Sequence, residues 1–163
     1  MTTVVVERSF RHPLTDEQLQ AAGRRAGPCF ELHGVAYLET FLAADRLRMC
    51  CVFDAPDAES VRIANRQSGA GFDVAWSTTL HAPERAVDVP PDTVPVLVER
   101  VFDAPVDLAT LAAREAAGQG CLDEHGVRWL RTYHALDRQR MLCVYAAPDA
   151  ESVRSVQRTL AMP

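Results

Sequence analysis

An identical run of eight residues occurs twice in this chain. The sequence Ala-Pro-Asp-Ala-Glu-Ser-Val-Arg occupies residues 55–62 and returns at residues 147–154, so the two copies are offset by 92 residues. The same offset aligns Cys29 with Cys121 and needs no gap anywhere in the chain. Self-similarity at a fixed spacing indicates a repeated structural unit. We therefore predict a tandem duplication of one module.

The repeated octet has the composition of a helix start. Its proline lacks a backbone N–H and is tolerated in the first helical turn, where that donor would be unpaired in any case. Its aspartate and glutamate place negative charge near the positive end of the helix dipole. These roles are structural, so we do not predict a functional site in the octet.

Local patterns in the first half predict alternating strands and helices. Runs of β-branched and aromatic residues predict strands, while cap residues, acid-rich first turns and Gly-Pro breaks delimit helices. The predicted elements are a strand at 4–10, a helix from 15 that Gly27-Pro28 ends, a hairpin of strands at 35–42 and 47–53, a helix from the octet to 68, and a strand at 72–80. The order β-α-β-β-α-β is that of the ferredoxin-like fold, in which two helices cover one face of a four-stranded antiparallel sheet.

The second half repeats this pattern except for its last strand. The predicted elements are a strand at 96–102, a helix at 108–117, strands at 127–135 and 139–146, and the octet helix to 160. Residue 163 aligns with Gly71, so the second module lacks a counterpart of strand 72–80. Its first strand would then be an unpaired edge, which proteins usually cover. We expect the first module, the linker or a second chain to cover strand 96–102.

The predicted domain organisation is a first ferredoxin-like module at 1–81, a proline-rich linker at 82–95, and a second, truncated module at 96–163. The second strand of each module carries large aromatic residues at alternate positions, which need a partner surface. We expect the modules to pair within the chain, sheet against sheet, as an α+β barrel with a cavity between the sheets. A homodimer is the alternative partner arrangement.

The charge and hydropathy patterns exclude several classes of function. The chain has 163 residues and a formal net charge of −5, with its arginines spread among acids. A nucleic-acid partner requires clustered Lys and Arg, so none is predicted. No stretch approaches the roughly 18 apolar residues that span a membrane, so we predict a cytoplasmic protein without a membrane partner. The five cysteines fit reduced thiols better than a disulfide framework.

The first duplicated constellation that could carry chemistry is a Cys-x3-His pair, Cys29 with His33 and Cys121 with His125. Thiolate and imidazole are good ligands for zinc, nickel or copper. One pair cannot hold an ion tightly, so a tight site requires the two modules or two chains to converge. The alternative is structural, with the cysteine a small buried residue at a helix end and the histidine a turn residue.

The second constellation is a Glu-Arg pair on the first strand of each module. A carboxylate that faces a cavity can act as a general base when burial raises its pKa, or as a metal ligand. Glu7 and Glu99 are therefore candidate catalytic residues. The alternative is a structural ion pair between each glutamate and an arginine of the neighbouring strand.

The third constellation is a Met-x-Cys motif on the third strand, Met49 with Cys51 and Met141 with Cys143. Its soft sulfur atoms would favour a thiophilic metal. Methionine and cysteine also fill hydrophobic cores without any such role.

Several motifs together resemble a known bacterial family. The first strand ends Glu-Arg-x-Phe, a Gly-Val precedes an aromatic second strand, the third strand reads Cys-Val-Phe or Cys-Val-Tyr, and the octet opens the second helix. This combination is similar to a small domain-of-unknown-function family that includes a nickel-binding protein. The resemblance covers residues 4–76 and 96–163.

The resemblance implies ferredoxin-like modules that pair through their sheets and bind a divalent metal with histidines and carboxylates. Many relatives carry a histidine in the octet helix, where this chain has Asn65 and Gln157. This departure leaves His33 and His125 as the stronger candidate ligands here.

Two functions follow as hypotheses. The preferred one is a non-catalytic protein that binds Ni²⁺ or another divalent transition metal through His33, His125, Cys29 and Cys121. The alternative is a small-molecule binder or enzyme that uses the cavity between the sheets, with Glu7 or Glu99 as the base. The expected partner is thus a metal ion or a small molecule.

Overall fold

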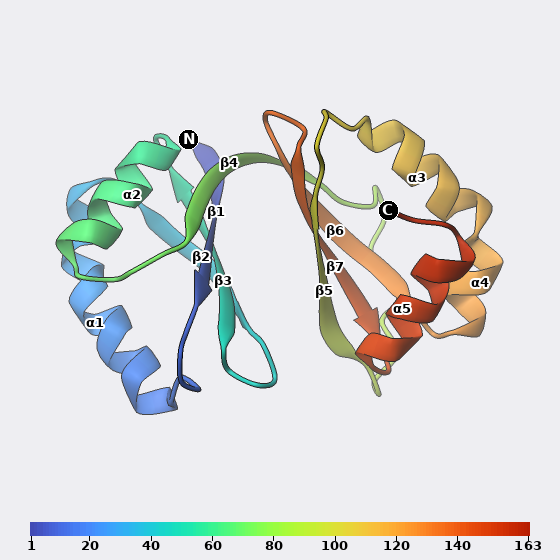
Figure 1. Ribbon diagram of the computed structural model, residues 1–163, viewed down its shortest axis with the longest axis horizontal. Coiled ribbons are helices and arrows are strands. Elements are labelled where there is room, and N and C mark those ends of the chain that lie inside the picture. Colours follow the sequence, from blue (N-terminus) through green and yellow to red (C-terminus); the bar gives the residue numbers. More distant parts are fainter. The chain divides into compact units, whose positions relative to one another are not determined.

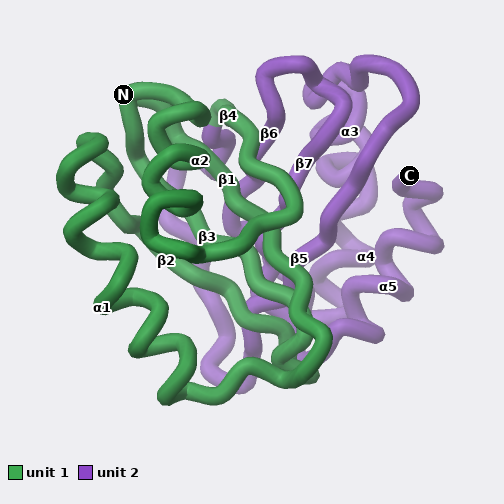
Figure 2. The backbone as a smooth tube through the Cα atoms, turned by 60° about the vertical axis from the view of Figure 1, so that its left-hand side comes forward, with its two compact units in different colours: residues 1–79 green, residues 80–163 purple.

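A computed structural model describes all residues from 1 to 163. The chain divides into two compact units, unit 1 at 1–79 and unit 2 at 80–163 (Figure 2). None of the helices has the length and apolar content of a membrane span. Each unit is an α+β arrangement in which the helices lie on one face of an antiparallel sheet (Figure 1).

Unit 1 has the predicted ferredoxin-like order of elements. They are β1 (Thr2–Ser9), α1 (Asp16–Leu32), β2 (Ala36–Leu42), β3 (Arg48–Ala55), α2 (Ala58–Gln67) and β4 (Val74–His81), whose last two residues belong to unit 2. The strands lie in the order β2-β3-β1-β4, with β1 antiparallel to both β3 and β4. Val4, Val6, Phe53 and Val61 are almost fully buried in the core that joins the sheet to α1 and α2.

Unit 2 repeats this order through its last helix, α5, which confirms the predicted duplication. Its elements are β5 (Val94–Val101), α3 (Leu108–Ala117), α4 (Gln119–Glu124), β6 (Arg128–Ala135), β7 (Arg140–Ala147) and α5 (Ala150–Thr159). The strands lie in the order β6-β7-β5. That the two sheets pack against each other stays a prediction.

The octet begins a helix in both units, but its proline has a different place from the predicted one. Asp57 and Asp149 are the N-caps of α2 and α5, and each accepts a hydrogen bond of 2.7 Å from the backbone N–H three residues later. Pro56 and Pro148 therefore precede the cap and lie outside the first turn. These capping bonds lower the pKa of both aspartates.

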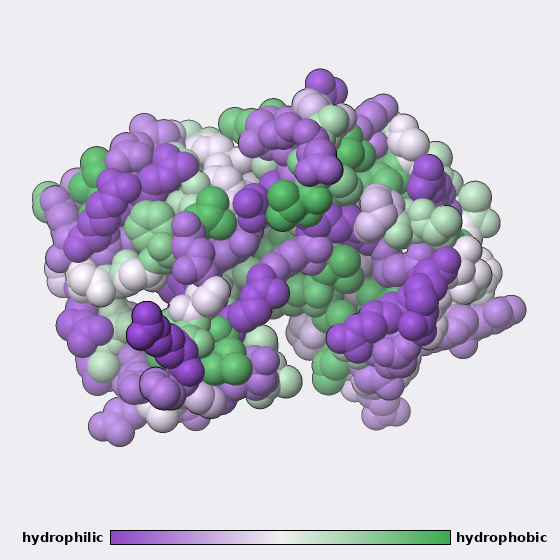
Figure 3. Space-filling model, in the orientation of Figure 1, coloured by the Kyte–Doolittle hydropathy of each residue, from purple (hydrophilic) through white to green (hydrophobic).

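The outer surface of the octet helices is charged. On α5, Glu151 forms ion pairs with Arg154 at 3.3 Å and Arg158 at 2.6 Å. Hydrophilic residues accordingly gather over α5 (Figure 3). The inner face of α5 buries Val153 and Val156. This helix is therefore amphipathic, with one face in the core and one in water.

The prediction that Gly27-Pro28 ends the first helix is wrong. The helix α1 runs through Pro28 to Leu32, and His33 is its C-cap. Continuing the helix places Phe30 against Phe53, with ring centroids 5.0 Å apart, and the chain turns only at Gly34 with a φ of 64°. Burial of an aromatic side chain contributes about 2 kcal/mol, which offsets much of the cost of a proline inside a helix.

The corresponding helix of unit 2 is broken into α3 and α4 at Gly118. By the offset of 92, Gly118 corresponds to Ala26 and Leu160 to Ser68. A Cβ atom on Gly118 would lie 2.2 Å from a methyl carbon of Leu160. Unit 1 pairs two small residues where unit 2 pairs glycine with leucine. Leu160 therefore requires a residue without a Cβ atom at position 118.

We predict that the effect of Gly118→Ala on the free energy of unfolding changes sign with the residue at position 160. In the natural background the added methyl group overpacks against Leu160 and should lower the free energy of unfolding by about 1–2 kcal/mol. In a Leu160→Ser background, which restores the small pair of unit 1, the same change should raise it by about 0.5 kcal/mol, because alanine restricts the unfolded chain. Urea denaturation of the four proteins measures both effects. Equal effects in the two backgrounds would contradict the predicted contact.

Candidate functional site

The Cys29–His33 pair lies at the end of α1. Both side chains are partly buried, and the backbone N–H of His33 donates to the carbonyl oxygen of Cys29. The imidazole Nε2 of His33 lies 2.7 Å from Oε1 of Gln67 on α2. One ring nitrogen of His33 is thus already engaged by a side chain of unit 1.

The Cys121–His125 pair lies at the corresponding end of α4 and is arranged differently. Sγ of Cys121 lies 3.9 Å from Nδ1 of His125. The same Nδ1 is 2.9 Å from the carbonyl oxygen of Cys121, to which it donates. Residue 159, which aligns with Gln67, is a threonine, so unit 2 lacks an equivalent side-chain amide. The thiol and the imidazole of unit 2 are therefore brought together.

These pairs are not part of larger ligand clusters. No group of three or more His, Cys, Asp or Glu side chains is placed so that it could hold a metal ion. Each unit therefore offers a pair of neighbouring donors, of which the unit 2 pair is the closer fit to a chelate.

Glu7 and Arg8 point to opposite faces of β1. The carboxylate of Glu7 accepts a hydrogen bond of 2.8 Å from the indole Nε1 of Trp76 on β4. Arg8 shares the face of Val6, which packs in the core beneath the helices. Glu99 occupies the same strand position on β5 and is partly buried. A role for Glu7 or Glu99 as a base stays a prediction.

The arginine of each Glu-Arg pair is buried and held by equivalent groups in both units. Arg8 is 7 % exposed and Arg100 5 %. Nε of Arg8 donates to the carbonyl oxygen of Gly71 at 3.0 Å, and Nε of Arg100 to that of Pro163 at 2.8 Å. In each case Nη2 donates to a side-chain amide of the octet helix, Asn65 in α2 or Gln157 in α5.

In unit 2 this arginine begins a longer chain of polar side chains. Nη2 of Arg100 donates to Oε1 of Gln157, whose Nε2 lies 3.4 Å from Oη of Tyr145. The Tyr145 hydroxyl donates in turn to Oε1 of Glu115 on α3. Nη1 of Arg100 also donates to Sγ of Cys143 at 3.2 Å. Four elements thus contribute to one network of polar groups between the sheet and the helices.

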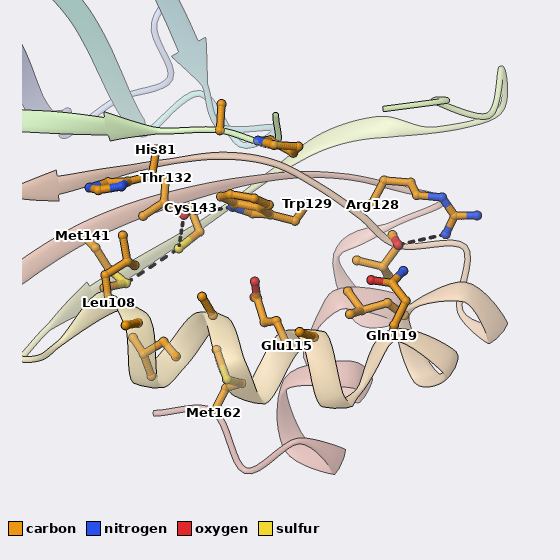
Figure 4. A pocket seen from close by; sticks show the side chains of 18 of the residues that line it. His81, Leu108, Glu115, Gln119, Arg128, Trp129, Thr132, Met141, Cys143 and Met162 are labelled. Atoms are coloured by element: carbon orange, nitrogen blue, oxygen red, sulfur yellow. Dashed lines mark hydrogen bonds between the residues drawn. The ribbon is translucent and has the colours of Figure 1, made fainter. Parts of the chain in front are cut away.

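The network borders a cavity of about 770 Å³ in unit 2 (Figure 4). Most of its lining is apolar and comes from residues 81–87, α3, α4, β6, β7 and the segment after α5. Figure 4 shows Glu115 reaching from α3 toward the sheet, with the indole of Trp129 on the opposite side. Nε1 of Trp129 donates to Oγ1 of Thr132 at 2.9 Å, so the orientation of the indole ring is fixed. A volume of this size is typical of small-molecule sites.

Unit 1 fills the equivalent space with aromatic side chains. Phe30 and Phe53 pack edge to face there. By the offset of 92, unit 2 replaces them with Leu122 and Tyr145 and replaces Gly23 with Glu115. The carboxylate of Glu115 therefore has no counterpart in unit 1.

Burial perturbs the titration of three groups in this network. It raises the pKa of Glu115, and the neighbouring Tyr145 hydroxyl and Arg100 only partly oppose that shift. It also raises the pKa of the Cys143 thiol and of the Tyr145 hydroxyl. Cys143 is thus held as a thiol that accepts hydrogen bonds from Arg100 and Thr132, so it is not an activated nucleophile.

The sequence motifs indicated neither this cavity in unit 2 nor the role of Glu115 in it. Glu115 aligns with Gly23, so it belongs to no duplicated motif. A usable signal was present in the differences between the copies. Glu115 is a charged residue at a predicted helix position where the first copy has Gly23. Packing alone does not require such a difference, so it indicates a candidate functional position.

Glu115 should make the stability of the protein depend on pH. Because its pKa is raised above the ordinary 4.5, the folded state binds this proton more tightly than the unfolded chain. The free energy of unfolding should therefore fall as the pH rises from 4.5 through the raised pKa. Glu115→Gln should remove that slope, and Glu124→Gln, an exposed change on α4, should leave it. Urea denaturation from pH 4.5 to 8 tests this, and an unchanged slope in Glu115→Gln would contradict it.

Of two similar solved structures, the one with a TM-score above 0.5 supports the fold. SCO4226 from Streptomyces coelicolor A3(2) is 16% identical with a TM-score of 0.42, and the match covers 52% of this chain and 99% of that one. A chlorite dismutase from Candidatus Nitrospira defluvii, solved with imidazole, is 11% identical with a TM-score of 0.52, covering 98% of this chain and 82% of that one. A search of curated proteins found no significant match.

A family model adds a match along most of the sequence. The model of SCO4226-like nickel-responsive proteins matches residues 5–77 and again residues 97–163. The two matches begin 92 residues apart, which is the offset of the octet. With its duplicated ferredoxin-like modules, the chain belongs to the SCO4226-like family of nickel-responsive proteins.

Proposed function

We propose that this protein binds a divalent transition metal, nickel foremost, and that Cys121 and His125 supply its principal ligands. The name of the family supports the choice of metal. The observation that carries the choice of residues is the 3.9 Å separation between Sγ of Cys121 and Nδ1 of His125. No catalytic step is part of this proposal.

The separation of the two donor atoms is close to that of a chelate. An ion bound tetrahedrally to one thiolate and one imidazole would hold the sulfur and nitrogen roughly 3.6 Å apart. Binding through Nδ1 requires the imidazole to carry its proton on Nε2, so the bond from Nδ1 to the Cys121 carbonyl oxygen is exchanged for a bond to the metal. The thiol must also lose its proton. Metal binding is therefore expected to release protons and to strengthen with pH.

Two protein donors leave the other coordination positions to water or to further donors. A site of this kind binds weakly and exchanges its metal readily, which suits a protein that responds to a rise in metal concentration. The Cys29–His33 pair is a second, weaker half-site in this proposal. The imidazole Nε2 of His33 already contacts Gln67, and this contact would be lost if the ring turned to bind a metal ion.

The test is titration calorimetry of nickel into metal-free protein that carries no affinity tag. We expect saturable binding in the wild-type protein. The double variant Cys121→Ser/His125→Ala should weaken the affinity for nickel at least tenfold, and adding nickel should raise the thermal unfolding midpoint of the wild-type protein but not that of this variant.

The matched control is the equivalent double variant of the other pair, Cys29→Ser/His33→Ala. Because the duplication places it at the same structural position, it removes the same two donor groups from a helix end with similar exposure. It should retain most of the affinity. Equal losses in both variants, or no heat of nickel binding in the wild-type protein, would contradict the proposed ligands.

A further inference from the structure

We infer that the cavity of unit 2 is a binding site for a small aromatic amine, whose cationic nitrogen pairs with Glu115 while its ring packs against Trp129. This function is separate from metal binding by the Cys121–His125 pair. It rests on three features of unit 2, namely an apolar cavity, a carboxylate that forms no ion pair and an indole of fixed orientation.

The enclosure is a product of divergence between the repeats. In unit 1 the equivalent positions hold Phe30 and Phe53, whose ring centroids lie 5.0 Å apart. Unit 2 has the smaller Leu122 in place of Phe30, and the remaining space is lined by apolar side chains such as Leu108, Leu111 and Met162. An empty apolar volume forfeits packing energy. A bound aromatic ring would restore the contacts that the two phenylalanines make in unit 1.

The carboxylate of Glu115 has one polar partner and no ion pair. Oε1 accepts the hydroxyl proton of Tyr145, while Oε2 accepts no hydrogen bond. The buried cation of this region, Arg100, donates instead to the Pro163 carbonyl oxygen, Cys143 and Gln157. A partly buried carboxylate is stabilised by a cation at hydrogen-bonding distance. The missing group is therefore a positively charged donor that arrives with the ligand.

The remaining charged groups of the cavity are already occupied. Arg128 pairs with Asp123 at 3.0 Å. Asp107 caps the N-terminus of α3 by accepting from the backbone N–H of Ala109. Asp107 is exposed to solvent, so Glu115 is the partly buried carboxylate of the lining, and the indole face of Trp129 lies across from it (Figure 4). An indole face attracts both aromatic rings and cations. Together these groups select a ring that bears an amine.

Three probes of one shape test the inference by calorimetry. Tryptamine carries the ring and a cation, tryptophol replaces the amine by a hydroxyl, and indole-3-propionate replaces it by a carboxylate. We expect tryptamine to bind with a stoichiometry of one, at least tenfold more tightly than tryptophol, and indole-3-propionate to bind most weakly. The indole N–H resonance of Trp129 in NMR spectra should shift with tryptamine.

Two variants assign the binding to this cavity. Glu115→Gln keeps the size of the side chain and an oxygen for Tyr145, and it should weaken tryptamine binding at least tenfold. Leu122→Phe restores the residue of unit 1 and should abolish binding while the protein stays folded. The control Glu124→Gln removes an exposed charge from α4 and should leave the affinity unchanged. Full tryptamine affinity in Glu115→Gln, or preferential binding of indole-3-propionate, would overturn the inference.

Discussion

The buried arginine on the first strand of each unit holds the fold together at its centre. Arg8 and Arg100 each join three segments, because the guanidinium reaches from the strand to the octet helix and to the backbone that follows that helix. A buried guanidinium is costly unless its donors are satisfied. Nη1 of Arg100 donates to Cys143, whereas the buried Nη1 of Arg8 has no hydrogen-bond partner. The position of the octet helix and the path of the chain after it are therefore constrained by one side chain. The offset of 92 reproduces the contacts of Nε and Nη2, although the amide differs between asparagine and glutamine.

The two units share these arginine contacts, but they fill the space between the sheet and the helices with different side chains. Unit 1 fills it with an edge-to-face pair of phenylalanines and a continuous helix α1. Unit 2 breaks that helix at Gly118, where Leu160 occupies the space, and extends the arginine network through Tyr145 to Glu115. After a duplication, one copy can change its core residues while the other keeps the original packing. The second copy can then acquire polar groups that weaken its core, which is common where a protein binds a ligand.

Much of the fold could be predicted from the sequence, because the ferredoxin-like order depends on local patterns that occur twice. The site was less accessible. The Cys121–His125 pair was visible as a spacing, but its difference from Cys29–His33 depends on Gln67, a residue 34 positions from His33 that only folding brings to its ring. Glu115 carries no motif, and its meeting with Tyr145 joins residues 30 positions apart. Such encounters depend on how the helix packs on the sheet, which no local pattern encodes.

The sequence by itself determined the duplication, its offset and the order of strands and helices in each unit. These are consequences of repetition and of short-range periodicity. Only the tertiary structure decided that the helix α1 passes through Pro28, that Arg8 rather than Glu7 enters the core, and that unit 2 encloses a cavity. The physical reason is the same in each case. Burial of distant side chains against one another outweighs local preference, and the volume left by the smaller Leu122 in place of Phe30 becomes visible only when its neighbours are in place.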